Sequence, residues 1–154
     1  MQVVHLMVYI EACEQELERC QRHGRVLSLM MMDLDNFKTI NDTNGHLVGD
    51  RALIDFVKRV SGQLRRPDKL GRFGGEEFVL LLPETPMDEA SRVAERIRET
   101  IQKNHVEHGC TVSIGVVTAV TGKESMDDLV ARADGALYRA EKSGRNRVEL
   151  EPGA

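Results

Sequence analysis

The sequence predicts an α/β domain of the α+β kind, in which a largely antiparallel sheet is covered by helices. Apolar runs of strand length alternate along the chain with longer stretches whose apolar residues recur at helical spacing. Two short apolar runs, at residues 69–73 and 78–82, flank a pair of glycines and predict a β-hairpin. Helices separate the remaining strands. This order favours a ferredoxin-like sandwich of about five strands.

The first half of the chain supplies a helix, a buried strand and a second helix. Residues 8–21 are rich in Glu and Arg and predict a helix, and the near-continuous apolar run RVLSLMMMD at 25–33 predicts a strand buried on both faces. The cluster NDTNG at 41–45 predicts a turn. A helix is expected from Asp50 until shortly before Pro67, because its apolar residues share one face: Leu53, Ile54, Val57, Val60 and Leu64.

After the hairpin, a helix start is expected around Pro86. Thr85 is the expected N-cap, Pro86 the first helical residue, and Asp88 a carboxylate in the first turn. The strand at 112–116 alternates Val, Ile and Val, which predicts one covered face.

The C-terminal part predicts one more helix and a final strand. Ser125 and Asp128 have the spacing of a helix start, and Gly144 is expected to end that helix. A last short strand is expected at 147–150.

Composition limits the classes of function. With 154 residues, 41% of them hydrophobic, the chain fits a single domain over 1–154. A net charge of -4 argues against a nucleic-acid polymer as partner, and the apolar runs are too short for membrane contact.

The odd set Cys13, Cys20 and Cys110 favours a reducing, cytoplasmic location. His105 and His108 have zinc-like spacing, but they sit in a predicted loop.

Four carboxylates are expected at the ends of neighbouring strands. Asp33 and Asp35 end the first buried strand, and Glu76 and Glu77 occupy the hairpin turn. If these strands are adjacent, the carboxylates repel one another, and either protonation or a cation must relieve the repulsion. Hard oxygen ligands without neighbouring His or Cys favour Mg²⁺.

The glycines before the carboxylates fit the same interpretation. Gly74 and Gly75 allow a tight turn and let a substrate lie against the backbone. The ordinary alternative is that Glu76 and Glu77 are hydrophilic turn residues and that Asp33 merely ends a strand. Spacing alone leaves both interpretations open.

Four motifs together resemble the GGDEF family of diguanylate cyclases, in its GGEEF variant. They are GGEEF at 74–78, DLDNFKTINDTNGHLVGD at 33–50, VSIGV at 112–116 and ARADGALYRAEKSGRNRV at 131–148. The resemblance covers residues 25–150 and implies the nucleotidyl-cyclase palm fold. It also implies that two GTP molecules become cyclic di-GMP and pyrophosphate in a homodimer, each domain holding one GTP at a two-fold interface.

By position in the family motif, Asp33 and Glu76 are expected to hold Mg²⁺, or Mn²⁺, on the triphosphate. The carbonyl of Leu34 is a further expected ligand. Glu77 would assist the metal or deprotonate the attacking hydroxyl, so the resemblance makes Glu76 and Glu77 the catalytic pair.

The resemblance also implies residues that bind the nucleotide. Asn41 and Asp50 match those that read the guanine edge, and Phe37 and Lys38 fall in the loop around the phosphates. Without the family, Asn41 would be a turn residue, Asp50 a helix N-cap and Lys38 a solvated charge.

A second set matches the family's product-inhibition site. Arg65 and Asp68 form the pattern Arg-x-x-Asp upstream of the hairpin, and Arg96 matches its second arginine. The alternative for Arg65 and Asp68 is a salt bridge at a helix end.

The chain departs from the family pattern in the last helix. Glu141 stands where a phosphate-binding Lys is usual, followed by Lys142, while Arg145 is retained. Either Lys142 substitutes for the missing Lys or nucleotide affinity falls; otherwise Lys142 and Arg145 simply complement the helix C-terminus.

The segment at 1–10 departs as well, since MQVVHLMVYI hardly matches the family's DxLTGLxNRR. It is a truncated or divergent wedge, or reflects a lost partner domain, and an attached or partner sensory domain is expected to regulate the protein. The leading prediction is a diguanylate cyclase with product inhibition. The alternative is a catalytically weak or inactive domain that binds GTP or cyclic di-GMP.

Overall fold

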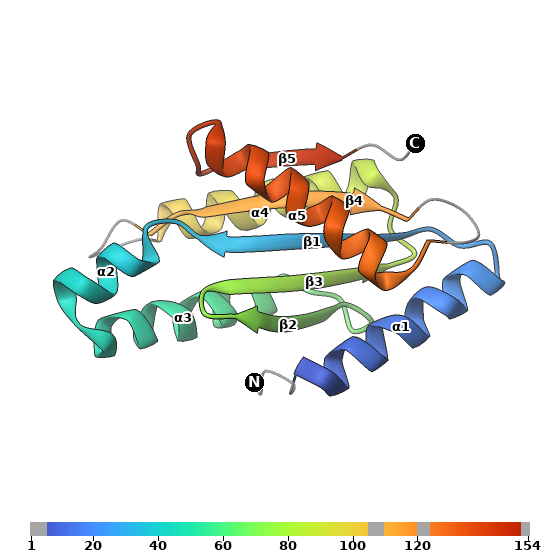
Figure 1. Ribbon diagram of the computed structural model, residues 1–154, viewed down its shortest axis with the longest axis horizontal. Helices are drawn as coiled ribbons and strands as arrows, with labels where there is room; N and C mark the ends of the chain where they lie inside the picture. The colour runs from blue at the N-terminus through green and yellow to red at the C-terminus, as the bar shows by residue number, and fades with distance from the viewer. Residues whose placement is uncertain (1–5, 105–109, 120–123, 152–154) are drawn as a thin grey trace.

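The computed structural model describes residues 6–104, 110–119 and 124–151, and these residues form a five-stranded sheet between two layers of helices (Figure 1). The strand order is β2-β3-β1-β4-β5. Every neighbouring pair is antiparallel except β4 and β5, which are parallel. The predicted, mostly antiparallel α+β sheet is therefore confirmed, with the strands β1 (Leu27–Leu34), β2 (Lys69–Gly74), β3 (Glu77–Pro83), β4 (Val112–Thr118) and β5 (Val148–Glu151).

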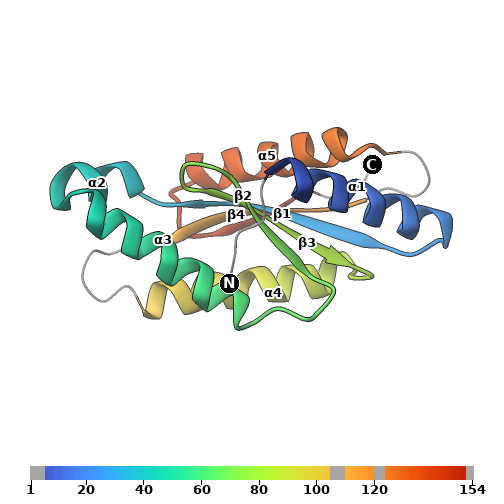
Figure 2. The same ribbon diagram turned by 90° about the horizontal axis from the view of Figure 1, so that it is seen from below.

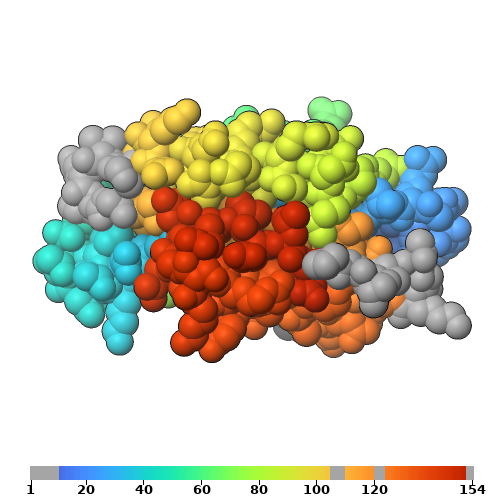
Figure 3. Space-filling view, turned by 90° about the horizontal axis from the view of Figure 1, so that it is seen from above, coloured from blue at the N-terminus to red at the C-terminus, as the bar shows by residue number. Residues whose placement is uncertain are grey.

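The helices divide between the two faces of the sheet. α1 (Leu6–Arg22) and α5 (Met126–Lys142) cover one face, and α3 (His46–Ser61) and α4 (Met87–Lys103) cover the other (Figure 2). α2 (Phe37–Asn44) extends past the end of β1. Viewed from above, the C-terminal residues in red lie between α4 in yellow and the first turns of α5 in orange (Figure 3).

β1 separates two apolar cores, as its continuous apolar run predicts. Leu29 and Met31 pack toward α1 and α5, while Met30 and Met32 pack toward α3 and α4. All four side chains are almost completely buried.

The prediction that β4 has one covered face is wrong, because the strand is buried on both faces. Ile114 and Val116 face the α3 and α4 core, and Val117 faces α5. Gly115 lies directly under α5, where a Cβ atom would come 2.3 Å from the backbone nitrogen of Leu137. The residues on this second face include Ser113 and Gly115, which are not large apolar residues, so the apolar periodicity of the sequence does not reveal it. Their small size is what allows α5 to approach the strand.

The turn predicted at 41–45 is also wrong for its first four residues, which end α2. Phe37 and Ile40 bury the inner side of this short helix and hold it in place. Gly45, with φ of 88°, separates α2 from α3. α3 consequently begins at His46 rather than Asp50, so Asp50 lies inside the helix and is no N-cap.

The remaining helix ends agree more closely with the sequence. Two predictions at the start of α4 are wrong: Pro86 is the N-cap rather than the first helical residue, because α4 begins at Met87, and Thr85 is therefore not the N-cap. The Thr85 hydroxyl donates to the Pro83 carbonyl at 2.9 Å instead. Ser125 and Asp128 form the expected capping box at the start of α5. α5 ends at Lys142, two residues before Gly144, whose φ is 120°.

Candidate active site

The ends of β1 and β3 bring three acidic residues together. Asp33 lies directly opposite Glu77 in the antiparallel pairing, and the Leu34 N–H donates to the Glu76 carbonyl at 3.3 Å. Residues directly opposite in such a pair project from the same face, with Cβ atoms about 5 Å apart. The structure therefore places Asp33 and Glu77 on the same face of the sheet, next to the turn that carries Glu76.

A two-residue turn joins β2 to β3 in front of these carboxylates. Gly74 pairs with Glu77, leaving Gly75 and Glu76 as the turn, and the Arg72 Nε donates to the Gly75 carbonyl at 2.8 Å. Gly75 has φ of 47° and Gly74 does not adopt positive φ. A Cβ atom at either glycine would meet nothing within 4 Å. Open space thus borders the backbone on this side, as a substrate site needs.

Asp33 is poorly accommodated as a charged group. Its Oδ1 is buried and has no hydrogen-bond partner. Burial, followed by the charges of Glu141, Glu76 and Glu77, raises the pKa of Asp33 to about 8. Burial also raises the pKa of Glu77, with a further contribution from Asp134. This end of the sheet therefore holds more negative charge than its own groups neutralise.

A hard divalent cation fits this donor set. The orphaned oxygen of Asp33 and the adjacent Glu76 and Glu77 are oxygen donors of the kind that Mg²⁺ prefers. Within the described residues, no group of three or more His, Cys, Asp or Glu side chains is arranged to hold a metal unaided. A cation here would complete its coordination with substrate phosphate oxygens and water, as Mg²⁺ commonly does.

Asp35 has a different role from the other carboxylates of the predicted cluster. It is 4% exposed, and it accepts hydrogen bonds from the hydroxyls of Thr111 and Ser113, both at 2.7 Å. It also accepts from the Asn146 N–H at 2.9 Å. Asp35 thus ties the end of β1 to the start of β4 and to the segment that follows α5, and its oxygens are already satisfied.

The last turn of α5 presents Glu141 to the site. The charge of Glu141 is the largest charge contribution to the raised pKa of Asp33, whereas Lys142 lies with its Nζ 5.4 Å from the centre of the Tyr138 ring. Burial raises the pKa of Glu141 itself, and nearby Arg145 opposes that shift.

The predicted guanine residues lie at the junction of α2 and α3. Asn41 has a buried Oδ1 without a hydrogen-bond partner, and Asp50 is exposed on α3. Gly49, which the sequence interpretation overlooked, makes room for Asn41, since a Cβ there would lie 1.6 Å from that oxygen. Lys38 is exposed, whereas the Phe37 side chain belongs to the core, so Phe37 can reach a phosphate only through its backbone.

The predicted product site is a network of hydrogen bonds in the turn before β2. Arg65 donates to Asp68 at 2.8 Å, to the Pro83 carbonyl at 2.9 Å and to the Thr85 hydroxyl at 2.7 Å. The alternative salt bridge thus exists, but it lies beyond the end of α3. Arg96 approaches the same region from α4, donating to Gln63 at 3.1 Å.

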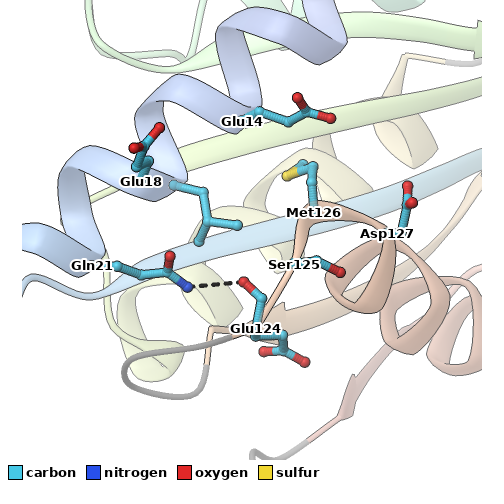
Figure 4. Close-up of a pocket in the computed structure, with 8 residues that line it drawn as sticks. Glu14, Glu18, Gln21, Glu124, Ser125, Met126 and Asp127 are labelled. Carbon is cyan, nitrogen blue, oxygen red and sulfur yellow. Dashed lines mark hydrogen bonds between the residues drawn. The ribbon is translucent and has the colours of Figure 1, made fainter.

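A pocket lies away from these residues, between α1 and the start of α5 (Figure 4). Its volume is about 240 Å³, and Glu14, Glu18 and Asp127 stand at its rim. The Gln21 side chain lines this pocket and donates to the Glu124 carbonyl at 2.9 Å. His105 and His108, weighed above as zinc ligands, lie outside the described residues.

Replacing Asp33 with Asn is expected to stabilise the protein in the absence of divalent metal. The pKa of Asp33 is near 3.8 unfolded and about 8 folded, so its ionisation increasingly favours the unfolded state as the pH rises from 4 to 8. In EDTA, the variant should melt about 4 °C or more above the parent at pH 8, and close to it at pH 4. Thermal unfolding followed by circular dichroism measures the melting temperatures. Equal melting temperatures at pH 8 would contradict the claim that the ionised Asp33 carboxylate destabilises the folded state.

Comparison with known proteins identifies the family of this chain. The model of the family described as "Diguanylate cyclase, GGDEF domain" matches residues 8–147. The chain belongs to the GGDEF domain family. The predicted family and the palm-type fold of this domain are confirmed.

Curated relatives of this GGDEF domain are named diguanylate cyclases. It is 41% identical over 145 residues to "Diguanylate cyclase DgcP" of Pseudomonas aeruginosa, covering 91% of the chain and 22% of the relative. It is 48% identical over 123 residues to "Diguanylate cyclase DgcM" of Escherichia coli, covering 79% of the chain and 30% of the relative. The chain thus spans well under half the length of these relatives.

Solved GGDEF domains have the same fold. The active GGEEF domain of a diguanylate cyclase from Vibrio cholerae superposes with a TM-score of 0.93 at 30% identity, covering 99% of the chain and all of that domain. The diguanylate cyclase SiaD of Pseudomonas aeruginosa, solved with its activator SiaC, gives 0.88 at 41% identity, covering 94% of the chain and 57% of SiaD. The family implies a divalent cation, and no helix in the described ranges is long and apolar enough to span a bilayer.

Proposed function

We propose that this domain is a diguanylate cyclase that condenses two GTP molecules into cyclic di-GMP and pyrophosphate at the interface of a homodimer. The observation that carries the proposal is the pairing of Asp33 with Glu77 beside the open glycine turn, with one buried Asp33 oxygen left without a partner. A buried carboxylate oxygen without a hydrogen-bond partner, next to two other carboxylates, is unfavourable for stability. Such an arrangement is typical of a functional site rather than of ordinary turn residues.

The carboxylates take distinct roles in this proposal. Asp33, Glu76 and the carbonyl of Leu34 would hold Mg²⁺, with Mn²⁺ as a substitute. The cation, when bound, supplies positive charge against the charge that develops on the α-phosphate. Glu77 accepts the proton of the attacking 3′-hydroxyl, and its raised pKa brings it closer to the operating pH, which suits a general base.

The nucleotide is held from the surrounding elements. Asn41, with its unsatisfied oxygen, and exposed Asp50 face the donors of the guanine edge. Lys38, Lys142 and Arg145 supply charge for the triphosphate, and the space beside Gly74 and Gly75 admits it.

The rival proposal is a domain that binds GTP or cyclic di-GMP without turnover. Glu141 favours it, because a carboxylate near the site opposes a triphosphate. Incubation of the protein with GTP and MgCl₂, followed by mass analysis of the nucleotides, separates the two. Cyclic di-GMP supports the enzyme, whereas bound nucleotide with no product supports the binding module.

Replacing Arg65 with Ala tests the proposed inhibitory site. The variant removes the guanidinium that would grip the product, so the cyclic di-GMP concentration for half-inhibition should rise at least about tenfold. Because Arg65 also bonds to Asp68, Pro83 and Thr85, the melting temperature should fall by a few degrees.

Arg66→Ala is the matched control, since Arg66 is exposed and has no hydrogen bond or ion pair among the described contacts. Its inhibition curve should equal that of the parent. An Arg65→Ala curve that also equals the parent would refute the inhibitory site and leave the cyclase assignment untouched.

Regulation is proposed to come from elsewhere in a longer protein or from a partner. The chain covers 22% of one curated relative and 30% of another, so an attached or partner sensory domain would bring two copies together. A cytoplasmic location, where GTP is available, is part of this proposal.

A further inference from the structure

The first turn of α3 contains a glycine that its backbone does not require. Gly49 is buried in the helix and does not have positive φ, so alanine could adopt the same backbone conformation. Alanine is also the better helix former of the two. The reason for a glycine at this position therefore lies in what a Cβ atom would contact.

The nearest atoms to a Cβ at Gly49 all belong to side chains. It would overlap the Asn41 carboxamide and would come 3.2 Å from the Phe37 ring. At Gly115, by contrast, the nearest atoms are backbone atoms of α5. Gly115 thus lets a helix approach a strand, whereas Gly49 leaves a recess for the tip of one side chain. We call this space the Gly49 recess.

The Asn41 carboxamide does not stabilise the fold by lying in the Gly49 recess. Its Oδ1 is buried there without a hydrogen-bond partner among the described residues. Burial of an unpaired carbonyl oxygen is unfavourable. Two unfavourable features, a glycine in a helix and an unpaired buried oxygen, therefore occur at the same point. Such departures from local rules are expected at functional sites.

The backbone around the Gly49 recess is fixed next to an exposed carboxylate. Asp50 follows Gly49 directly and is exposed. The Gly45 N–H donates to the Asn41 carbonyl at 2.8 Å, and the Gly49 N–H donates to the Gly45 carbonyl at 3.3 Å. These two bonds join the end of α2 to the start of α3. With the backbone held in this way, the size of residue 49 determines where the Asn41 amide lies.

We propose that Gly49 is a positioning residue for guanine recognition, which keeps the Asn41 carboxamide set back beside Asp50 so that one base edge meets both groups. The inference rests on the proposed function and deepens it, because Asn41 and Asp50 are the proposed readers of the base. Guanine carries adjacent N–H donors, which a carboxylate and an amide oxygen accept together. A side chain at position 49 would turn the amide out of the recess and leave Asp50 to read the base alone.

A double-mutant cycle between Gly49→Ala and Asn41→Ala tests this inference. Binding of an α,β-methylene analogue of GTP is measured by isothermal titration calorimetry in MgCl₂; the analogue lacks the P–O bond that the proposed reaction breaks, so it is not consumed. Gly49→Ala should weaken binding about tenfold, which corresponds to the loss of one hydrogen bond. In the Asn41→Ala background it should change binding by less than about twofold, because the amide through which it acts is absent.

The melting temperature distinguishes positioning from packing. Because only the tip of a side chain must move, Gly49→Ala should melt at or above the temperature of the parent. Gly62→Ala is the matched control, since Gly62 caps the other end of α3 and a Cβ there would come no closer than 3.5 Å to the Lys58 carbonyl. It should bind the analogue like the parent.

Three results would overturn the inference: a Gly49→Ala variant that binds the analogue like the parent, equal weakening in both backgrounds, or a melting temperature several degrees below that of the parent. None of them bears on cyclic di-GMP synthesis by the parent, which the mass analysis reports separately. A parent that follows the expected cycle but makes no cyclic di-GMP would retain this inference and lose the proposed activity. A parent that binds no guanine nucleotide would lose both.

Discussion

Glu77→Gln is expected to lower cyclic di-GMP formation by at least about 100-fold, because it removes the proposed base while keeping the shape of the side chain. Glu77 lies opposite Asp33 at the end of two buried strands, so its backbone is fixed by the sheet. An amide at this position cannot accept the proton of the 3′-hydroxyl. The initial rate of product formation, measured by mass analysis or by released pyrophosphate, reports the effect.

The fold and the nucleotide affinity should survive this change. Glu77 is only partly buried and its carboxylate repels Asp134 and Glu76, so the amide should melt at or slightly above the temperature of the parent. Glu99→Gln on α4 makes the same chemical change away from the site and should leave the rate unaltered. A Glu77→Gln variant that keeps more than a tenth of the parental rate would assign the base elsewhere.

The sheet was predictable because its strands carry strong local signals. The run from Leu29 to Met32 is wholly apolar, and the two glycines mark the hairpin turn. The α2 helix was not predictable in this way. Its last residues, from Asn41 to Asn44, favour turns, and only the burial of Phe37 and Ile40 in the assembled core makes them helical.

The candidate site was only partly readable from the sequence. Asp33, Glu76 and Glu77 follow from the motif and from the ends of the expected strands. The separate role of Asp35 depends on its bond to the Asn146 N–H, 111 residues further along the chain. Likewise, the approach of Glu141 depends on the packing of α5 against Gly115. Such long-range contacts leave no periodic trace in the sequence.

Gly115→Ala is expected to be the most destabilising of the substitutions considered. The added Cβ would lie 2.3 Å from the Leu137 nitrogen and 2.4 Å from the Ala133 carbonyl oxygen. Both are backbone atoms of a helix, so relief requires moving α5 as a unit rather than rotating one side chain. We expect a loss of about 3 kcal/mol in the free energy of unfolding, and a melting temperature roughly 6–12 °C lower.

Gly135→Ala is the control, because Gly135 lies on α5 itself and a Cβ there meets nothing within 4 Å. Alanine in a helix interior is favoured over glycine by up to about 1 kcal/mol, so this variant should equal or exceed the parent in urea unfolding. A Gly115→Ala variant with parental stability would contradict the close packing of α5 on β4 at this glycine. It would also contradict the position of Glu141 that depends on this packing.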